Sequence, residues 1–488
     1  MAQVVLSGII LFELYRFITR HLSVKEIGVW SMVLASTAVG RLADMGLGGG
    51  VVKFVAEDLG RGDRASAART VCMSLVGMAA LTAAACLASY PVLYYVLPKL
   101  IAETAYFNAA RDLLPYALSS LFVSALSGVV LSGLDGCQRM DRRAVTSTIG
   151  AVVQLAAAYL LVPRFGLRGL AGGQVIQGLF TFATGAFFLV RQLEVTQLRW
   201  SAWDGARFKA MLSYGGSFQA AALGQLLFEP VVKALLTRFG GLEFTGYYEM
   251  ANRLLLQLRS VIVSAFQALV PYVAGGMITT TRLQNVYVSS YRLLFLAAVP
   301  YYSLIGVTLP LALTLWLGRF ESKFVLTGAI CLAGWSSNTM NVPAYFLYLA
   351  TGRLRWTVLS HFAIGLLACA LGTLGGWLWG GLGVLGASAF ALSLGSHVVP
   401  MAFHREYRVR VSELMPLGNV ALLLVGISGV IAAVVVSVTE ASEGLSHLTM
   451  ATLLIALVDA TLLAVLSWRD ASRERLVNIV RELLRGPA

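Results

Sequence analysis

The sequence predicts an all-α integral membrane protein with about fourteen membrane-spanning helices. Apolar residue types make up 58% of the 488 residues and charged residues only 12%, whereas soluble domains average about 25% charged residues. The apolar residues recur in blocks of about 20, the length that a helix needs to cross roughly 30 Å of hydrocarbon. Since only helices and closed barrels satisfy their backbone in a bilayer, these continuous runs indicate helices.

The predicted spans follow one another along the whole chain. They lie near residues 1–19, 27–48, 71–98, 113–134, 144–162, 168–190, 211–236, 246–274, 292–317, 324–350, 356–379, 382–403, 414–437 and 448–468. The first stretch has no basic start and no small-residue cleavage site, so we expect a span there rather than a signal peptide. Val51–Arg69 and Leu476–Arg485 mix apolar residues with arginines, which predicts amphipathic helices on the cytoplasmic surface.

Basic residues divide unevenly between alternate loops. The loops after even-numbered spans, together with the C-terminal tail, hold 22 Lys and Arg, whereas the loops after odd-numbered spans hold 9. Because positive residues collect on the cytoplasmic side, we expect both termini to be cytoplasmic. The net charge of +13 has the same explanation and gives no reason to expect a nucleic-acid partner.

An internal repeat divides the first twelve spans into two sets of six. Identities at an offset of 218 are Thr19/Thr237, Arg20/Arg238, Gly28/Gly246, Met32/Met250 and Arg41/Arg259, and those at 215 are Gly150/Gly365, Gly166/Gly381, Leu167/Leu382 and Leu170/Leu385. Since six is an even number, both copies keep the same orientation in the membrane. We therefore expect six-helix lobes at 1–195 and 205–403, followed at 404–488 by two extra spans and a cytoplasmic amphipathic tail.

Charged residues inside the predicted spans are concentrated on four helices. A charge at mid-bilayer costs about 3 kcal/mol on insertion scales, so each retained charge is a candidate functional residue. Nine lie on spans 1, 2, 7 and 8: Glu13, Arg16, Arg41, Asp44, Glu229, Lys233, Glu249, Arg253 and Arg259. The other two are Arg292 and Asp459. One polar cleft shared by both lobes would explain this distribution.

Two interpretations of these charges stay open. Four pairs lie three or four residues apart and could neutralise each other on one helix face: Glu13/Arg16, Arg41/Asp44, Glu229/Lys233 and Glu249/Arg253. Alternatively, the cations bind an anionic substrate while the acids couple an ion. The substrate-binding candidates are then Arg16, Arg41, Lys233, Arg253, Arg259 and Arg292, and the ion-coupling candidates are Glu13, Asp44, Glu229 and Glu249. Arg259 has no acid three or four residues away, which makes it the strongest candidate.

The sequence predicts no catalytic residue, no metal site and no cofactor. Gly381–Gly386 fits a dinucleotide-binding pattern, but this string joins two apolar spans and follows no strand. The five histidines are far apart in sequence and lack metal-ligand spacing. An enzyme is therefore not expected.

Six stretches, in this order, carry a family resemblance: Gly28–Trp30, Leu42–Leu47, Gly246–Ala251, Pro271, Asn341–Phe346 and Thr351–Arg355. Together they resemble the multidrug/oligosaccharidyl-lipid/polysaccharide exporter superfamily, and within it the polysaccharide (O-antigen type) flippase branch. The resemblance covers spans 1 to 12. It implies two six-helix lobes around a central cleft that opens alternately to each side, with a lipid-linked sugar as cargo, and it places the cleft beside the helices that carry the charges.

The resulting hypothesis is a flippase that moves polyprenyl-pyrophosphate-linked sugar repeat units from the inner to the outer leaflet of a bacterial cytoplasmic membrane, for surface polysaccharide biosynthesis. Expected partners are this glycan, membrane lipids, and polysaccharide polymerase and glycosyltransferases. One alternative is a cation-coupled exporter of drugs or small molecules, whose cleft should hold more acidic than cationic residues. Spans 1, 2, 7 and 8 carry five cations and four acids, a weak preference for an anionic cargo. Another is a membrane transferase or ligase acting on the same lipid intermediate, which would alter the glycan covalently.

Overall fold

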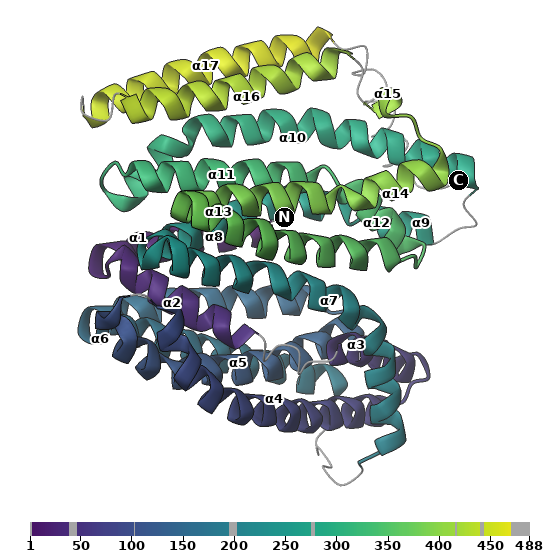
Figure 1. Cartoon of the computed structure of the whole chain (residues 1–488). Helices are drawn as coiled ribbons and strands as arrows, with labels where there is room; N and C mark the ends of the chain where they lie inside the picture. Colours follow the sequence, from purple (N-terminus) through teal and green to yellow (C-terminus); the bar gives the residue numbers. More distant parts are fainter. Residues whose placement is uncertain are drawn as a thin grey trace. The chain divides into compact units, whose positions relative to one another are not determined.

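The chain is helical throughout the residues that the computed structural model describes, which are 2–38, 46–101, 103–194, 203–274, 279–414, 417–439 and 444–469. No strand occurs within these ranges (Figure 1). The elements are α1 (Ala2–His21), α2 (Val24–Thr37), α3 (Leu47–Gly60), α4 (Arg64–Leu100), the 3₁₀ turn η2 (Thr104–Tyr106), α5 (Phe107–Gly136), α6 (Met140–Leu193), α7 (Gly205–Phe239), α8 (Gly241–Phe266), α9 (Leu269–Ala274), α10 (Thr280–Leu317), α11 (Ser322–Thr339), α12 (Val342–Ala350), α13 (Arg355–Ser396), α14 (Val398–Tyr407), α15 (Val411–Leu414), α16 (Leu417–Thr439) and α17 (Leu445–Arg469).

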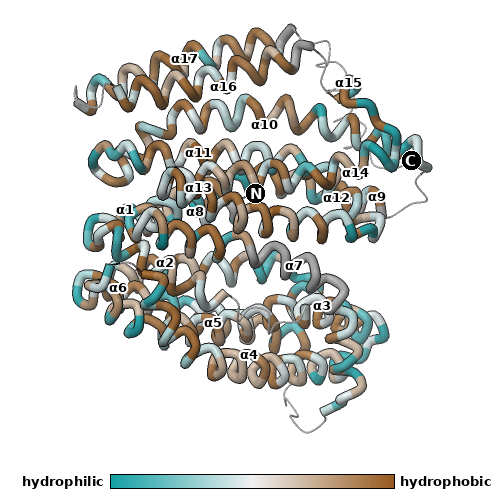
Figure 2. The backbone as a smooth tube through the Cα atoms, viewed as in Figure 1, coloured by the Kyte–Doolittle hydropathy of each residue, from teal (hydrophilic) through white to brown (hydrophobic). Residues whose placement is uncertain are grey.

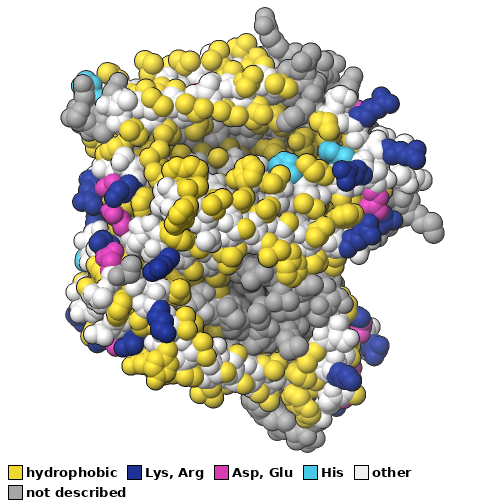
Figure 3. Space-filling model, in the orientation of Figure 1, with side chains coloured by type: hydrophobic (Ala, Val, Ile, Leu, Met, Phe, Trp, Pro, Cys, Tyr) yellow, Lys and Arg dark blue, Asp and Glu magenta, His cyan; other side chains and the backbone are white. Residues whose placement is uncertain are grey.

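Seven of the described helical segments are long and apolar enough to cross a membrane. Two of them, α6 and the α13–α14 segment, contain a break that divides each into two arms. Together with α1, α2, α7, α8 and α11, the described helices agree with the predicted fourteen, and the all-α membrane fold is confirmed. The helices are hydrophobic along their middles and more hydrophilic at their ends (Figure 2). On the face drawn in Figure 3, Lys and Arg side chains gather near helix ends.

The break in α6 is a reversal of the chain at a single glycine. Gly166 has φ 55° and ψ −130°, a conformation that glycine adopts far more readily than other residues. The two arms pack closely beside the break, since a Cβ on Gly169 would lie 2.4 Å from the carbonyl oxygen of Leu161. α13 breaks over two residues, Trp379 with φ −132° and ψ 16° and Gly380 with φ 60° and ψ −142°. Each hairpin accounts for two of the predicted spans.

The chain forms two compact units. The first comprises Met1–Glu249 and Gly376–Val384, and the second comprises Met250–Gly375 and Leu385–Ala488. The boundary falls within α8 because α7 and the beginning of α8 pack against α2 in the first unit. The lobes at 1–195 and 205–403 stay a prediction.

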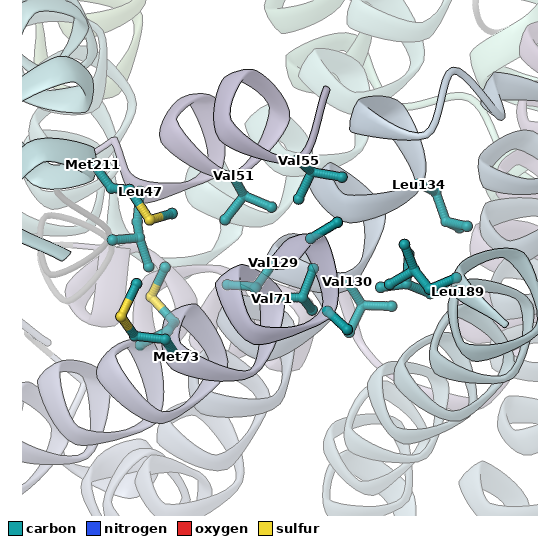
Figure 4. Close-up of a cluster of buried hydrophobic side chains, with 14 residues drawn as sticks. Leu47, Val51, Val55, Val71, Met73, Val129, Val130, Leu134, Leu189 and Met211 are labelled. Carbon is teal, nitrogen blue, oxygen red and sulfur yellow. The ribbon is translucent and has the colours of Figure 1, made fainter. Parts of the chain in front are cut away.

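A hydrophobic core in the first unit forms where α3 packs against α4 and α5 (Figure 4). Leu47, Val51 and Val55 lie four residues apart on one face of α3 and are fully buried. Met211 from α7 closes the same core. The apolar face of α3 therefore covers protein rather than lipid.

The amphipathic helix predicted at Val51–Arg69 is wrong in its extent. The helix ends at Gly60, and Arg64 begins the membrane-crossing α4. Between them Gly62 takes a left-handed conformation, and the Asp63 carboxylate caps α4 by accepting a hydrogen bond from the Ser66 backbone N–H at 2.8 Å. The other predicted amphipathic segment, Leu476–Arg485, lies outside the described residues, as does the rest of the C-terminal tail.

In the second unit, α10 packs against both helices of the C-terminal hairpin, α16 and α17. Phe295 and Val299 of α10 are buried with Leu422 and Leu463 in a shared core. Asp459, the single charge predicted in the last span, is buried on α17 and accepts a hydrogen bond from Ser303 Oγ at 2.6 Å. The polar side of α17 thus faces protein.

Candidate functional site

A buried ionic cluster in the first unit joins α1, α2, α7 and α8. Lys233 Nζ lies 2.6 Å from Glu229 Oε1 and 2.6 Å from Glu249 Oε2. Glu249 also accepts hydrogen bonds from Ser31 Oγ at 2.7 Å and Tyr15 Oη at 3.2 Å. We call these five residues the Lys233 cluster. Because each element contributes a partner, the two buried charges are neutralised without help from solvent.

Access to the Lys233 cluster is one-sided. The side chains of Lys233 and Glu249 are 3% and 4% exposed, whereas the Glu229 side chain is 44% exposed. An incoming anion would therefore compete with Glu229 before it could reach the ammonium group. The cluster contains two carboxylates for one ammonium, which also suits it to holding a proton or another cation.

The Lys233 cluster is positioned by a close crossing of α2 and α8. A Cβ on Gly28 would lie 2.0 Å from the Leu242 carbonyl oxygen, and one on Gly246 would lie 2.2 Å from the Val24 carbonyl oxygen. One turn further along each helix, Ser31 and Glu249 form their hydrogen bond. Both pairs, Gly28/Gly246 and Ser31/Glu249, stand 218 residues apart in the sequence. Contacts between such equivalent positions are what a local twofold axis between α2 and α8 would produce.

A second polar cluster lies in the second unit, around Arg259 on α8. The Arg259 guanidinium donates to Asn338 Oδ1 at 2.7 Å and lies 5.3 Å from the ring centre of Trp335. Trp335 Nε1 in turn donates to Asn252 Oδ1 at 2.7 Å. We call these four residues the Arg259 cluster. Among the described residues the buried Arg259 Nε has no hydrogen-bond partner, so the guanidinium keeps donor capacity.

The other predicted site residues that the structure describes are engaged elsewhere. Arg16 Nη1 lies 3.5 Å from Glu13 Oε2 on α1, and both side chains are exposed. Arg253 is also exposed. Arg292 donates through Nε to the backbone carbonyl of Glu413 at 2.8 Å, which ties α10 to the segment around α15. These contacts suit structural roles at helix surfaces.

Arg41 and Asp44, predicted respectively as a substrate-binding and an ion-coupling residue, lie outside the described residues. Of the intrahelical pairs that the sequence allowed, Glu13/Arg16 and Glu229/Lys233 form. Glu249 lies within ion-pair distance of Lys233 on a different helix. A pairing between helices cannot be read from sequence spacing.

Sequence reasoning missed the uncharged members of both clusters. These are Tyr15, Ser31, Asn252, Trp335 and Asn338. They carry no charge, so the cost of a charge in a bilayer does not single them out. One signal is present in the sequence: Asn252 precedes Arg259 by seven residues and so shares its helix face. Within the described ranges, no three or more His, Cys, Asp or Glu residues are grouped so that they could hold a metal ion.

Comparisons with known proteins give one family match and several solved structures of similar fold. The profile of a family described as polysaccharide biosynthesis protein matches residues 4–277, which is more than half of the chain. No curated protein matches the sequence.

Several solved structures match the fold. The lipid II flippase MurJ in an inward closed conformation is 12% identical with a TM-score of 0.74, covering 97% of this chain and 99% of that one. An inward-facing multidrug resistance MATE family transporter of the MOP superfamily is 14% identical with a TM-score of 0.69, covering 82% and 94%. A MOP superfamily transporter from Pyrococcus furiosus is 15% identical with a TM-score of 0.54, covering 88% and 96%. The likeness is one of fold.

Proposed function

Since this chain belongs to the polysaccharide biosynthesis protein family, we propose that it is a lipid-linked oligosaccharide flippase of the bacterial cytoplasmic membrane. The resemblance to the exporter superfamily is confirmed by this family and by the matching transporter folds. The protein is a transporter or flippase by class rather than a transferase or ligase. The proposed cargo is a polyprenyl-pyrophosphate-linked sugar repeat unit, moved from the inner to the outer leaflet by alternating access. Polysaccharide polymerase and glycosyltransferases would act beside it.

The observation that carries this proposal is the Arg259 cluster. An arginine inside a spanning helix is costly and is retained where it serves a purpose. Its planar fork of donors matches the oxygens of a pyrophosphate. The adjoining Trp335 ring and the Asn338 amide provide a stacking face and hydrogen-bonding groups of the kind that suit a sugar. One cluster could therefore hold both parts of the polar head while the polyprenyl chain stays in the bilayer.

Membrane voltage favours the proposed direction of transport. A pyrophosphate carries about two negative charges across an inside-negative membrane, and each charge moved outward releases about 2.3 kcal/mol per 100 mV. Voltage could supply the direction without proton coupling.

The proposal is tested by replacing Arg259 in a strain that lacks its own flippase. We expect Arg259→Ala to abolish surface polysaccharide and to leave lipid-linked repeat units accumulating inside, because the pyrophosphate loses its cation. Arg259→Lys should retain a fraction of activity, since lysine keeps the charge but loses the planar fork. Arg41→Ala should give a milder loss, because Asp44 follows it by three residues, a spacing at which an acid neutralises part of the arginine's charge.

The matched control is Arg319→Ala, an exposed arginine in the turn between α10 and α11. This variant should complement fully at equal membrane protein level. Full surface polysaccharide from Arg259→Ala would remove Arg259 from the mechanism and, with it, the observation on which this function rests.

A cation-coupled exporter of small molecules is the second candidate, and the Lys233 cluster favours it. Two carboxylates around one ammonium group suit the binding and release of a proton or sodium ion. Purified protein in vesicles separates the two functions. An exporter would move a cationic dye against its gradient when an ion gradient is imposed, whereas the flippase would leave the dye in place and translocate the lipid-linked glycan.

A further inference from the structure

A cavity lies at one end of the hairpin formed by α13 and α14, between the start of α13 and the end of α14. Its volume is about 450 Å³, and its lining includes Arg355, Trp356 and Arg405. The first and second arms of this hairpin are joined next to the cavity, because Ser360 Oγ donates to the Gly395 carbonyl oxygen at 2.9 Å. The cavity is thus built from one rigid pair of helices within the second unit.

The cavity presents two arginines to its contents. Arg355 and Arg405 are exposed, and within the described part of the chain neither forms an ion pair. The Arg355 guanidinium lies 4.6 Å from the ring centre of Trp356, a stacking contact that leaves its N–H groups available. The carboxylate of the lining, Glu406, is already engaged by Tyr348 Oη at 2.8 Å and by Arg353. An anion would therefore meet two unneutralised cations.

An exposed apolar stripe runs from Arg355 along the first arm. Leu359 and Leu366 follow Arg355 by four and eleven residues, so the three residues share one helix face. Both leucines are exposed, and Leu366 is 66% exposed. On a membrane-crossing helix, such a face meets lipid.

The second arm carries a matching stripe that ends at Arg405. Met401, Leu394 and Phe390 precede it by four, eleven and fifteen residues, and all three are exposed. The spacing carries across the junction of α13 and α14 because His397 there keeps near-helical dihedral angles, φ −70° and ψ −10°. Each arm thus places a cation at the head of an apolar face.

We propose that this cavity binds the head-group phosphate of an anionic membrane phospholipid, with its acyl chains lying along the two stripes. Arginine forks match phosphate oxygens, and a tryptophan at the end of a span prefers the interface between lipid and water. The loops at this end, around Arg353 and Arg408, belong to the side predicted to be cytoplasmic, where anionic lipids are concentrated. The site is separate from the Arg259 cluster and does not depend on the proposed cargo.

Native mass spectrometry of the detergent-solubilised protein, titrated with phosphatidylglycerol, tests the proposal. The double variant Arg355→Ala/Arg405→Ala should bind the lipid about tenfold more weakly, because two charge-assisted contacts are lost. Arg355→Lys/Arg405→Lys should retain most of the binding, which separates loss of charge from misfolding. The matched control, Arg408→Ala/Arg410→Ala, removes two exposed arginines from the same end and should bind as the wild type does.

Three further ligands distinguish the sources of the phosphate. Phosphatidylcholine, which has similar chains but no net charge, should be retained about tenfold less than phosphatidylglycerol. Inorganic phosphate and a polyprenyl pyrophosphate should displace bound phosphatidylglycerol only when the competitor's concentration is well above that of phosphatidylglycerol. Equal retention of phosphatidylcholine, displacement by either competitor at lower concentration, or an equal loss in the control pair would overturn the assignment.

Discussion

Lys233 is an ammonium group enclosed by α1, α2, α7 and α8, and its surroundings make it costly to alter. Removing one partner of a buried ion pair leaves the other charge buried without compensation and typically costs about 3–5 kcal/mol. An exposed pair contributes only about 0–1 kcal/mol. The Lys233 cluster therefore has a structural consequence that can be measured separately from transport.

We expect Lys233→Met to lower the thermal unfolding temperature of the purified protein markedly, because the buried Glu249 carboxylate loses the ammonium group that lies 2.6 Å from it. Lys233→Met/Glu249→Gln should recover much of the loss, since it removes both buried charges. Arg139→Met serves as control, because its pair with Asp141 is exposed, and it should leave the unfolding temperature unchanged. An equal effect of Lys233→Met and Arg139→Met would show that the buried pair carries no stability.

At the scale of the element, the crossing of α2 and α8 depends on two glycines. A methyl group at Gly28 meets backbone atoms, which cannot rotate away as a side chain could. The helices must then separate, and the Ser31–Glu249 hydrogen bond one turn away lengthens with them. Overpacking of this kind costs about 1–3 kcal/mol.

Gly28→Ala and Gly246→Ala should each reduce both the unfolding temperature and the transport activity. Gly128→Ala is the matched control, because Gly128 lies in α5 with open space around its Cβ position. There the alanine should be neutral or slightly stabilising, since it lowers the conformational entropy of the unfolded chain. Unfolding curves in detergent and complementation at equal membrane level give the two readouts. If Gly28→Ala kept the unfolding temperature and the transport activity of the wild type, the close contact between α2 and α8 would not be required for either.

The sequence predicts the spans because each one depends only on a continuous apolar stretch of sufficient length. It also placed both hairpins, with their reversals near Gly166 and Gly380. The sequence prediction fails at Val51–Arg69, where charge and apolar periodicity indicate one surface helix although Gly62 and Asp63 divide the stretch. A helix that covers protein and one that covers lipid have the same apolar face.

The sequence predicts the candidate sites only in part, for a related reason. The cost of a charge in a bilayer singles out Lys233 and Glu249, but their mutual contact depends on how α7 meets α8. Asn338 and Trp335, which complete the Arg259 cluster, carry no charge. The free-energy cost of a charge in the bilayer therefore does not mark them as candidates. Pairing across helices is a property of packing, which a single sequence does not express.

At the scale of the whole molecule, the uneven distribution of basic residues predicts that both termini are cytoplasmic. Reporter fusions after Arg143 and Arg410 should therefore report cytoplasm, and a fusion after Glu440 should report the exterior. A reporter that is active only in the cytoplasm, paired with one that is active only outside, gives each position two independent readings. A reversed result at any two of the three positions would refute the orientation.

The tight reversals of the chain, at Gly166 in α6 and at Trp379 and Gly380 in α13, have a consequence for what this protein exposes outside the cell. Both occur where the orientation above places the exterior, and each passes from one spanning arm to the next with no intervening loop. A protease, an antibody or a phage tail fibre needs several residues of accessible, extended chain to bind. At Gly166 and Gly380 it would find only a tight turn between packed helices, so intact cells should resist cleavage, labelling and epitope insertion at these two positions.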